Sequence, residues 1–243
     1  MSLVVLGLSG ALTHDPSAAI YVDGELIAAA EEERFTRQKH AKNAMPLHAA
    51  RYVLQEANLK AKDVDVVAFP FGKISLFGKA RWHYAKRHWY APDRALDAIF
   101  NGNRHYRRNV KKVRELLVEL GINWADIEFD AVEHHIAHAS SSYHLSGFEG
   151  KTAILGIDGK GEYATTFFGY GENGHIHKIK EFYDPDSLGQ LYASFTEYLG
   201  FEMLDGEYKV MGMAPCLLYT PDSADEEHSV DLGGRRFIKK KKL

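Results

Sequence analysis

Three histidines within five positions, His134, His135 and His138, are the residues best suited to chemistry. On a helix, His134 and His138 stand four residues apart, so their rings project from one face about one turn apart. This spacing lets two imidazoles bind one divalent metal, and a carboxylate with open positions would complete a site for Fe(II) or Zn(II). A run of structural histidines is the alternative that the pattern leaves open.

A glycine-rich segment, Asp158-Gly159-Lys160-Gly161, directly follows an apolar run that reads as a strand. Glycines allow backbone N–H groups to turn inward and cradle phosphate oxygens. Asp158, at the end of the strand, could hold a metal or orient a water molecule. The same residues also suit an ordinary tight turn, and taken alone they favour that interpretation.

Three further segments carry polar residues near expected turns. His14 and Asp15 lie in a Gly-flanked loop, where an imidazole that titrates near neutrality could take a proton from an acceptor hydroxyl. Lys39 follows a charged run and could meet an anion. Lys209 and Gly212 lie in a Gly-bounded segment that could line a phosphate cleft. An exposed turn, a solvated face and a plain loop are the respective alternatives.

The first half of the chain supplies alternating strands and helices to carry these residues. Leu3–Leu8 reads as a buried strand, and Asp23-Gly24 between two apolar runs is a strong hairpin signal. Pro46–Leu59 and Val110–Leu120 have the periodicity of amphipathic helices. Val64–Phe71 reads as a further buried strand. We therefore expect an α/β unit that begins with a strand and a hairpin.

The opening pattern returns about 150 residues later. Thr152–Ile157 reads as a strand ending in the glycine-rich segment, Tyr163–Tyr170 and His175–Tyr183 read as a hairpin, and Gly189–Leu199 reads as a helix. Two units that each begin with a strand and a hairpin, facing each other, are the plan of the actin-like ATPase (ribonuclease H-like) fold. The sequence thus predicts an α/β protein with a complete first subdomain and a truncated second one.

Composition excludes several classes of protein. The 243 residues carry a net charge of −3 and are 45% hydrophobic, which is ordinary globular composition and gives no reason to expect a nucleic-acid partner. One cysteine, Cys216, rules out a disulfide framework within the chain. No apolar run approaches the length of a membrane span, and the first residues do not resemble a signal peptide. We expect a soluble cytoplasmic protein without a membrane partner.

Three segments are predicted from these patterns. Residues 1–150 would form the first actin-like subdomain, and residues 151–215 the start of the second. Residues 216–243 lose hydrophobic periodicity and separate acidic from basic residues, which predicts a disordered tail.

Taken in order, the motifs resemble one family, the ATP-dependent O-carbamoyltransferases that modify nodulation factors and antibiotics, and in particular their N-terminal domain. The resemblance runs from the first residues to about Pro215. It is carried by GLSGALTHDPSAAIYVDGELIAAAEEERFTRQKH, VEHHIAHASSSYHLSGF, DGKGEYATTFFGYG, SLGQLYASFTEYLGF and GEYKVMGMAP.

The resemblance implies a chemistry. Carbamoyl phosphate and ATP, with Mg, would give a carbamoyl-adenylate, and this domain would pass the carbamoyl group to an acceptor hydroxyl of a small molecule. By motif position, His134 and His138 would bind a divalent metal, iron before zinc. His14 would act as base beside the acceptor, with Asp15. The adenylate would be contacted by Lys39, Asp158, Gly159, Gly161, Lys209 and Gly212.

The resemblance also has limits. Family members are longer, and from Cys216 the similarity ends, so the adenylate-forming part would come from a separate C-terminal partner. The carboxylate ligand of the metal is likewise expected to lie outside this chain. Two alternatives stay open: a non-catalytic module or remnant that binds nucleotide or metal, and a metal-dependent transferase resembling the enzyme that makes threonylcarbamoyl-adenosine on tRNA.

Overall fold

A computed structural model describes residues 2–10, 15–218, 228–230 and 236–238, with side chains described up to residue 215 in the last long helix. None of the helices in these ranges is long and apolar enough to cross a membrane. The elements are β1 (Val4–Leu8), β2 (Ser17–Val22), β3 (Glu25–Glu31), α1 (Glu33–Thr36), η1 (Lys39–Ala41), α2 (Leu47–Glu56), η2 (Ala61–Asp63), β4 (Val66–Phe69), α3 (Lys79–Arg87), α4 (Pro92–Asn101), α5 (Arg104–Leu120), η3 (Trp124–Asp126), β5 (Glu128–Ala131), α6 (His134–Tyr143), β6 (Thr152–Ile157), β7 (Ala164–Glu172), β8 (His175–Tyr183), α7 (Leu188–Tyr198), α8 (Glu207–Leu218), β9 (His228–Val230) and β10 (Arg236–Ile238).

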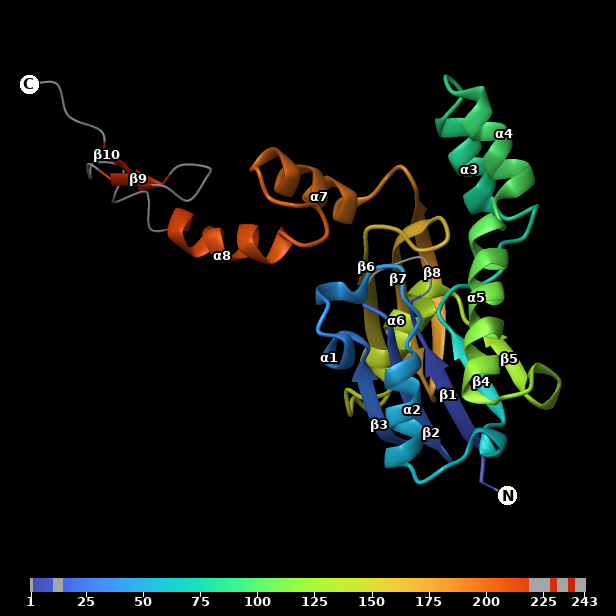
Figure 1. Cartoon of the computed structure of the whole chain (residues 1–243). Coiled ribbons are helices and arrows are strands. Elements are labelled where there is room, and N and C mark those ends of the chain that lie inside the picture. Colours follow the sequence, from blue (N-terminus) through green and yellow to red (C-terminus); the bar gives the residue numbers. More distant parts are fainter. Residues whose placement is uncertain (1, 11–14, 219–227, 231–235, 239–243) are drawn as a thin grey trace, which may run out of the picture.

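The first half of the chain forms a five-stranded sheet in the order β3-β2-β1-β4-β5. The first three strands form an antiparallel meander, whereas β4 and β5 run parallel to β1. Helices α2 and α5 cover one face of this sheet (Figure 1). This order and these strand directions are those of a subdomain of the actin-like ATPase (ribonuclease H-like) fold, so the predicted fold class is confirmed.

The core lies between this sheet and its two helices. Successive strand side chains point to opposite faces, so Leu6, Leu8 and Ile20 all face the helices, where each is at most 1% exposed. Val53 of α2 and Leu117 of α5 meet them and are fully buried. Removing such side chains from water is the main stabilising contribution to the sheet–helix layer.

Local signals set the ends of these elements as expected. Pro46 immediately precedes α2, where its missing N–H costs nothing. Gly121 ends α5 in the left-handed region, at φ 77°, which glycine adopts without strain. Asp23-Gly24 forms the β2–β3 turn, with both residues at positive φ.

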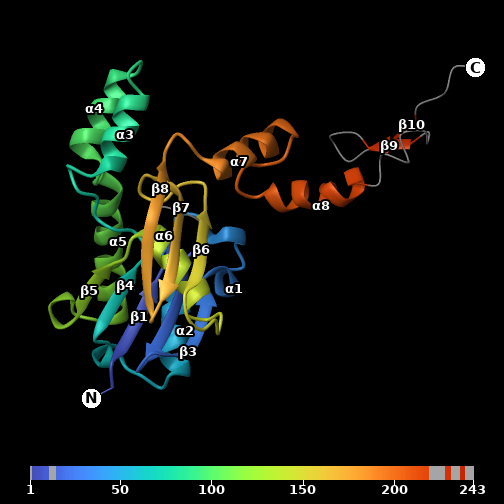
Figure 2. The same cartoon turned by 180° about the vertical axis from the view of Figure 1, so that it is seen from behind.

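The second sheet is antiparallel, in the order β6-β7-β8, and Asn173-Gly174 forms its hairpin turn at positive φ. Helix α6 lies against it and between the two sheets (Figure 2). Helices α7 and α8 extend to one side of both sheets. The second strand-and-hairpin pattern is therefore confirmed. The division at residues 150/151 stays a prediction.

The segment that holds Lys209 and Gly212 is not a loop: it is helix α8, which continues past residue 215 although Pro215 lies inside it. Most of residues 216–243, for which a disordered tail is predicted, lie outside the described residues.

Candidate metal and substrate site

The paired histidines meet a carboxylate at the junction of the two sheets. His134 opens α6 directly after β5, and His138 lies one turn later on the same helix. Asp158 follows the last residue of β6. The Nε2 atom of His134 is 3.0 Å from Oδ2 of Asp158 and 3.0 Å from Nε2 of His138. The Nε2 atom of His138 is 4.0 Å from the same carboxylate oxygen.

These separations suit ligands that share one ion. For bonds of about 2.1 Å, two ligands at right angles around a metal lie about 3.0 Å apart, and two in a tetrahedron about 3.4 Å. The three ligand atoms all lie within 4.8 Å of one another. Two imidazoles and one carboxylate with other positions open are a ligand set that suits Fe(II), and the 4.0 Å between His138 Nε2 and Asp158 Oδ2 is wider than either geometry gives. Asp158 places a carboxylate of this chain beside the two imidazoles, whereas the sequence led us to expect that ligand outside the chain; its role as a metal ligand stays a prediction.

The surroundings of His134 fix its ring. Nδ1 of His134 is 3.2 Å from the carbonyl oxygen of Pro70, which can only accept, so Nδ1 carries a hydrogen and donates it. Nε2 then faces Asp158 and His138: when protonated it donates to the carboxylate, and when neutral it can offer its lone pair to a metal. The ring of Phe71 packs 4.8 Å from the His134 ring, centroid to centroid. A backbone acceptor that holds the far nitrogen is the usual support of a metal-binding imidazole.

The charge balance of the cluster favours a cation. Burial opposes the charged form of His134, but the hydrogen bond and charge of Asp158 outweigh it and raise the pKa of the ring. Burial, with the neighbouring His134, lowers the pKa of His138. The hydrogen bond from His134 lowers the pKa of Asp158 to about 2. The carboxylate is therefore ionised at neutral pH and His138 offers a neutral ring.

His135 is not one of the three residues whose ligand atoms lie within 4.8 Å of one another, although its Nε2 comes within 3.8 Å of Asp158 Oδ2. It is 1% exposed and points into the interior, where burial lowers its pKa to about 4. Neither ring nitrogen has a hydrogen-bond partner among the described residues. The neutral ring thus acts as packing between α6 and the second sheet, beside Phe167 at 6.1 Å between centroids.

A carboxylate from the connection between β6 and β7 holds the start of α6. Glu162 accepts the backbone N–H of His134 at 3.1 Å and that of Gly72 at 2.6 Å. The first N–H groups of a helix lack partners within the helix and carry a partial positive charge, so an anion there is stabilising. Sequence reasoning missed this role, because Glu162 is 28 residues away along the chain.

The glycine-rich segment packs tightly against its neighbours. The N–H of Gly159 donates to Asp158 Oδ1 at 2.6 Å, and the N–H of Gly161 donates to the carbonyl of Ala164 at 2.8 Å. These two donors are engaged within the loop, so the predicted phosphate cradle is not preformed there. A Cβ on Gly189, at the start of α7, would lie 2.5 Å from the nitrogen of Gly159. Gly189 therefore allows α7 to approach the loop.

A second polar cluster joins the first hairpin region to the α7–α8 connection. Nδ1 of His40 is 2.8 Å from Asp15 Oδ1, and Nε2 of His40 is 2.9 Å from Asp205 Oδ1. Lys39 Nζ approaches the same Asp205 oxygen at 2.5 Å. Hydrogen bonds that His40 donates to Asp205 and Asp15 raise the pKa of His40, and those that Lys39 and His40 donate to Asp205 lower the pKa of that carboxyl to about 2.

The backbone around His40 is unusual. Arg37, His40, Ala41 and Asn43 all have φ between 34° and 64°, a region that side chains rarely adopt. Such conformations persist where surrounding contacts impose them, and they concentrate at functional sites. No sequence signal marked His40 as the centre of this cluster.

The remaining predicted residues are divided between these places. Lys209 lies near Lys39, since both ammonium groups are 5.5 Å from the ring centroid of Tyr208. Gly212 stands apart, with no atom within 4 Å of a Cβ built on it. His14 lies outside the described residues. The roles assigned to all these residues stay predictions.

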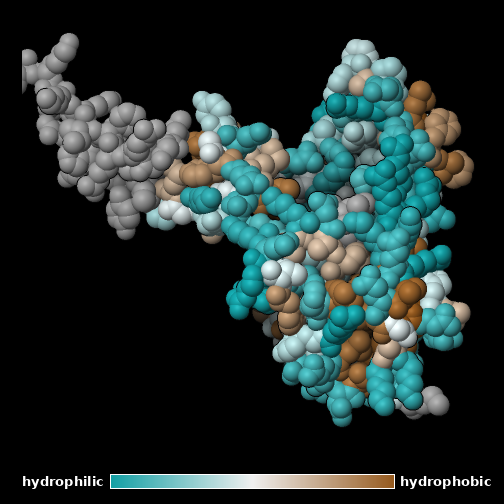
Figure 3. All heavy atoms as spheres, viewed as in Figure 1, coloured by the Kyte–Doolittle hydropathy of each residue, from teal (hydrophilic) through white to brown (hydrophobic). Residues whose placement is uncertain are grey.

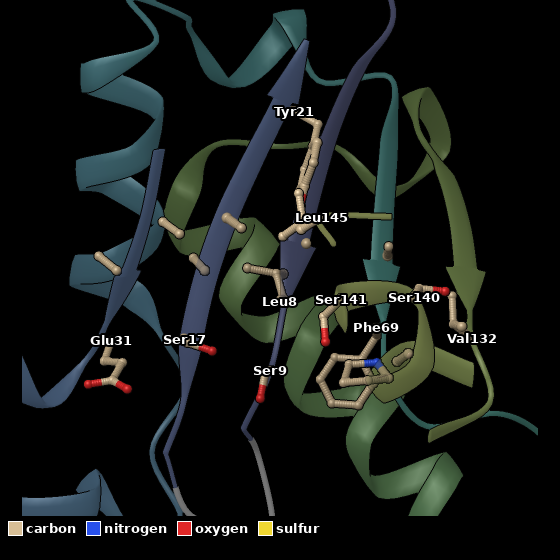
Figure 4. Close-up of a pocket in the computed structure, with 18 of the residues that line it drawn as sticks. Leu8, Ser9, Ser17, Tyr21, Glu31, Phe69, Val132, Ser140, Ser141 and Leu145 are labelled. Atoms are coloured by element: carbon tan, nitrogen blue, oxygen red, sulfur yellow. The ribbon is translucent and has the colours of Figure 1, made fainter. Parts of the chain in front are cut away.

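The largest cavity described, of about 1260 Å³, does not include the histidine cluster. It lies between the free face of the first sheet and α6, and is lined by side chains that include Tyr21, Phe69 and Ser141 (Figure 4). Ala29, Ala19, Gly7 and Ala68 are aligned by register straight across four strands and leave its floor flat. Its walls are mostly apolar, and Glu31 and Arg34, which line it, pair with each other at 3.0 Å. We therefore give more weight to the histidine cluster than to this larger space.

Comparison with known proteins assigns the chain to a family. Residues 4–224 match the family described as the carbamoyltransferase N-terminus. An uncharacterized protein of Synechocystis sp. is 37% identical over 218 residues, which cover 87% of this chain and 34% of that protein. The nodulation protein NolNO of Sinorhizobium fredii is 35% identical over 231 residues, covering 88% of this chain and 31% of its own length. The chain thus spans about a third of these relatives.

Among solved structures, YeaZ from Pseudomonas aeruginosa aligns with a TM-score of 0.39 and 18% identity, over 74% of this chain and 66% of that one. A Ppx/GppA family member from Aquifex aeolicus aligns with a TM-score of 0.35 and 12% identity, over 81% and 55% of the two chains. These similarities are distant, and the fold assignment rests on strand order instead. On the match over residues 4–224, the chain belongs to the carbamoyltransferase N-terminal family.

Proposed function

We propose that this chain is the metal- and substrate-holding part of an ATP-dependent O-carbamoyltransferase. The observation that carries the proposal is the convergence of His134, His138 and Asp158 in a member of this family. The carbamoyl donor would be carbamoyl-adenylate, made from carbamoyl phosphate and ATP, and the acceptor a hydroxyl of a small molecule.

In the proposed transfer, one bond forms and one bond breaks at the carbamoyl carbon. The acceptor oxygen forms a bond to the carbamoyl carbon, the bond from that carbon to the adenylate phosphate oxygen breaks, and AMP leaves while the hydroxyl proton passes to a base. His14 is the proposed base, and Asp15, held by His40 at 2.8 Å, would orient it.

The chain's own residues would divide the remaining tasks. His134, His138 and Asp158 would hold the metal, and the Pro70 carbonyl and the Glu162 carboxylate would keep His134 in place. A divalent metal bound there would supply Lewis-acid stabilisation of charge on the carbamoyl oxygen. Lys39 and Lys209 would contribute positive charge beside the leaving phosphate, and Lys39 would exchange Asp205 for that group.

A partner corresponding to the rest of the relatives' length is part of the proposal. One face of the second sheet carries Leu155, Ile157 and Phe168, which are 57%, 52% and 43% exposed. The strand register puts these side chains on one face together with Phe182. An apolar face of this kind marks an interaction surface. The equivalent of the relatives' C-terminal two thirds is the proposed occupant, and it would form the adenylate.

The test combines the chain with that partner. Purified chain is mixed with the C-terminal two thirds of the Synechocystis relative, ATP, Mg and carbamoyl phosphate labelled in its carbon. Label should move into an AMP-linked species and then, with an acceptor, into a neutral product. His134→Ala should abolish the second step and leave the first. Label that never leaves carbamoyl phosphate, or a His134→Ala chain as active as the wild type, would refute the proposal.

A further inference from the structure

The helical arm formed by residues 73–114 differs in charge from the rest of the chain. It contains α3, α4 and the first part of α5, and α3 and α4 lie beyond the ends of both sheets (Figure 1). It holds 12 of the chain's 30 lysines and arginines but only 2 of its 33 aspartates and glutamates. The helical arm therefore carries a formal charge of +10 and the remaining residues −13, although the whole chain is near neutral at −3.

Several of these cations can meet an external anion. Lys79 and Lys86 lie on the exposed side of α3, and Arg107 lies on that of α5. Among the residues that the structure describes, none of the three has a carboxylate within ion-pair distance. Of the two carboxylates in the helical arm, Asp97 is already bound to Arg104 at 2.8 Å. The surface of the helical arm thus offers a surplus of positive charge.

Large apolar side chains project from the same helical arm. Leu96 and Phe100 stand four residues apart on α4 and so share one face, opposite the buried Ala98. Phe77, Trp89 and Phe100 are 84%, 80% and 71% exposed. Figure 3 shows hydrophobic side chains gathered along the outer edge of α3 and α4, on the side away from α7. Single exposed apolar residues are ordinary, but a group of them at one end of a molecule marks an interaction surface.

Buried contacts hold this apolar group in place. The side chain of Arg81 is buried and donates to the carbonyl of Ile99 at 2.7 Å and to that of Ile74 at 3.1 Å. The loop before α3, which carries Phe77, is thereby fixed against the end of α4, which carries Phe100. The apolar surface is therefore preorganised, so that little conformational entropy is lost when it binds a partner.

We propose that the helical arm binds the surface of a membrane that contains anionic lipids. Its apolar and aromatic side chains enter the boundary between headgroups and acyl chains, and the surrounding lysines and arginines meet the lipid phosphates. The negative charge of the other residues keeps them away from the same surface, so the molecule binds in one orientation. Leu96 favours a bilayer over a single-stranded nucleic acid, because a base stacks on an aromatic ring and gains little from an aliphatic side chain.

The composition of the whole chain predicts no membrane partner, because it averages over these two oppositely charged parts. The test therefore measures binding to vesicles directly. Vesicles of equal parts phosphatidylcholine and phosphatidylglycerol are sedimented with the chain, beside vesicles of phosphatidylcholine alone. Only the anionic vesicles should carry the chain down, and less of it as salt is raised, because salt screens exposed charges. The fluorescence of Trp89 should shift to shorter wavelength as the ring leaves water, and Trp89→Phe should remove most of this shift.

Matched variants separate the apolar contribution from the charge. Phe100→Ala should weaken binding to the anionic vesicles by about tenfold, the loss expected when one large apolar side chain stays in water. Lys86→Gln should weaken it by about fivefold, the share of one cation near an anionic surface. Phe148→Ala, in the loop after α6, and Lys62→Gln, in η2, change exposed residues outside the helical arm and should leave binding unchanged.

Two kinds of result would overturn the inference. The first is sedimentation that does not depend on phosphatidylglycerol, or that is the same in the folded Phe100→Ala and Lys86→Gln chains as in the wild type. The second is another occupant: a single-stranded oligonucleotide or the C-terminal part of the Synechocystis relative that displaces the vesicles, or a dimer formed through Phe100 that binds no vesicle. The assay contains neither metal nor carbamoyl donor, so its outcome is independent of the proposed carbamoyl transfer.

Discussion

Glu162→Gln should loosen the helix that carries the paired histidines. The carboxylate of Glu162 accepts two backbone N–H groups from the other side of the junction, those of Gly72 at 2.6 Å and His134 at 3.1 Å. Glutamine keeps the size of the side chain and one acceptor oxygen, but it removes the charge that strengthens both bonds.

The size of the effect follows from these two bonds. A hydrogen bond to a charged group contributes about 1 kcal/mol more than a neutral one, so two bonds lose about 2 kcal/mol. The start of α6 also loses the favourable interaction of an anion with the helix dipole, which adds about 0.5 kcal/mol. Because His134 begins this helix, its ring also becomes less well placed, and the affinity for metal should fall by about 10- to 100-fold.

Urea unfolding followed by circular dichroism measures the first effect, and competition with a coloured chelator measures the second. Glu172→Gln is the matched control, because Glu172 lies at the end of β7, where Lys151 approaches it only to 3.9 Å. The control should change neither quantity. A Glu162→Gln chain with wild-type stability and wild-type metal affinity would refute the reasoning.

Two further predictions concern the loop contacts. Gly189→Ala should destabilise the chain by about 2 kcal/mol in urea unfolding, because its Cβ would meet the backbone of Gly159 at 2.5 Å. Gly212→Ala in α8, with open space around it, should instead stabilise the chain by about 0.5–1 kcal/mol. A Gly212→Ala chain less stable than the Gly189→Ala chain would contradict the packing described for these two glycines. The stabilisation from the contact of protonated His40 with Asp205 should be fully present below pH 6.5 and be lost as pH rises through the raised pKa of His40. At the acid end the contact is lost only in strong acid, where Asp205, with its pKa lowered to about 2, becomes protonated. NMR titration should show a lower His40 pKa in the Asp205→Asn chain than in the wild type. An unchanged pKa would contradict this explanation of the cluster.

Local patterns were enough to predict much of the fold. The β2–β3 and β7–β8 hairpins follow from Asp23-Gly24 and Asn173-Gly174, because these turns need residues that tolerate positive φ. The histidine pair follows from helical spacing, since α6 does begin at His134. Such features depend on residues close together in the chain.

Other features depend on contacts that no local pattern contains. Asp158 meets His134 only because β6 ends beside the start of α6, 24 residues earlier in the chain. His40 meets Asp205 across 165 residues. The plain loop that the sequence left open as an alternative for this segment is replaced by helix α8: Gly206, Gly212 and Pro215 suggest a loop, but a helix tolerates an internal glycine at a cost of about 1 kcal/mol, and packing can override propensity.

The most direct test of the proposed metal site is the metal content of the purified chain and of four variants. Elemental analysis of the wild type should give about one equivalent of iron or zinc, and His134→Ala, His138→Ala and Asp158→Ala should each lose it. His144→Ala, at the other end of α6 and outside the cluster, is the matched control and should keep it. A folded wild-type chain that binds neither metal, or variants that retain it as the control does, would contradict the account.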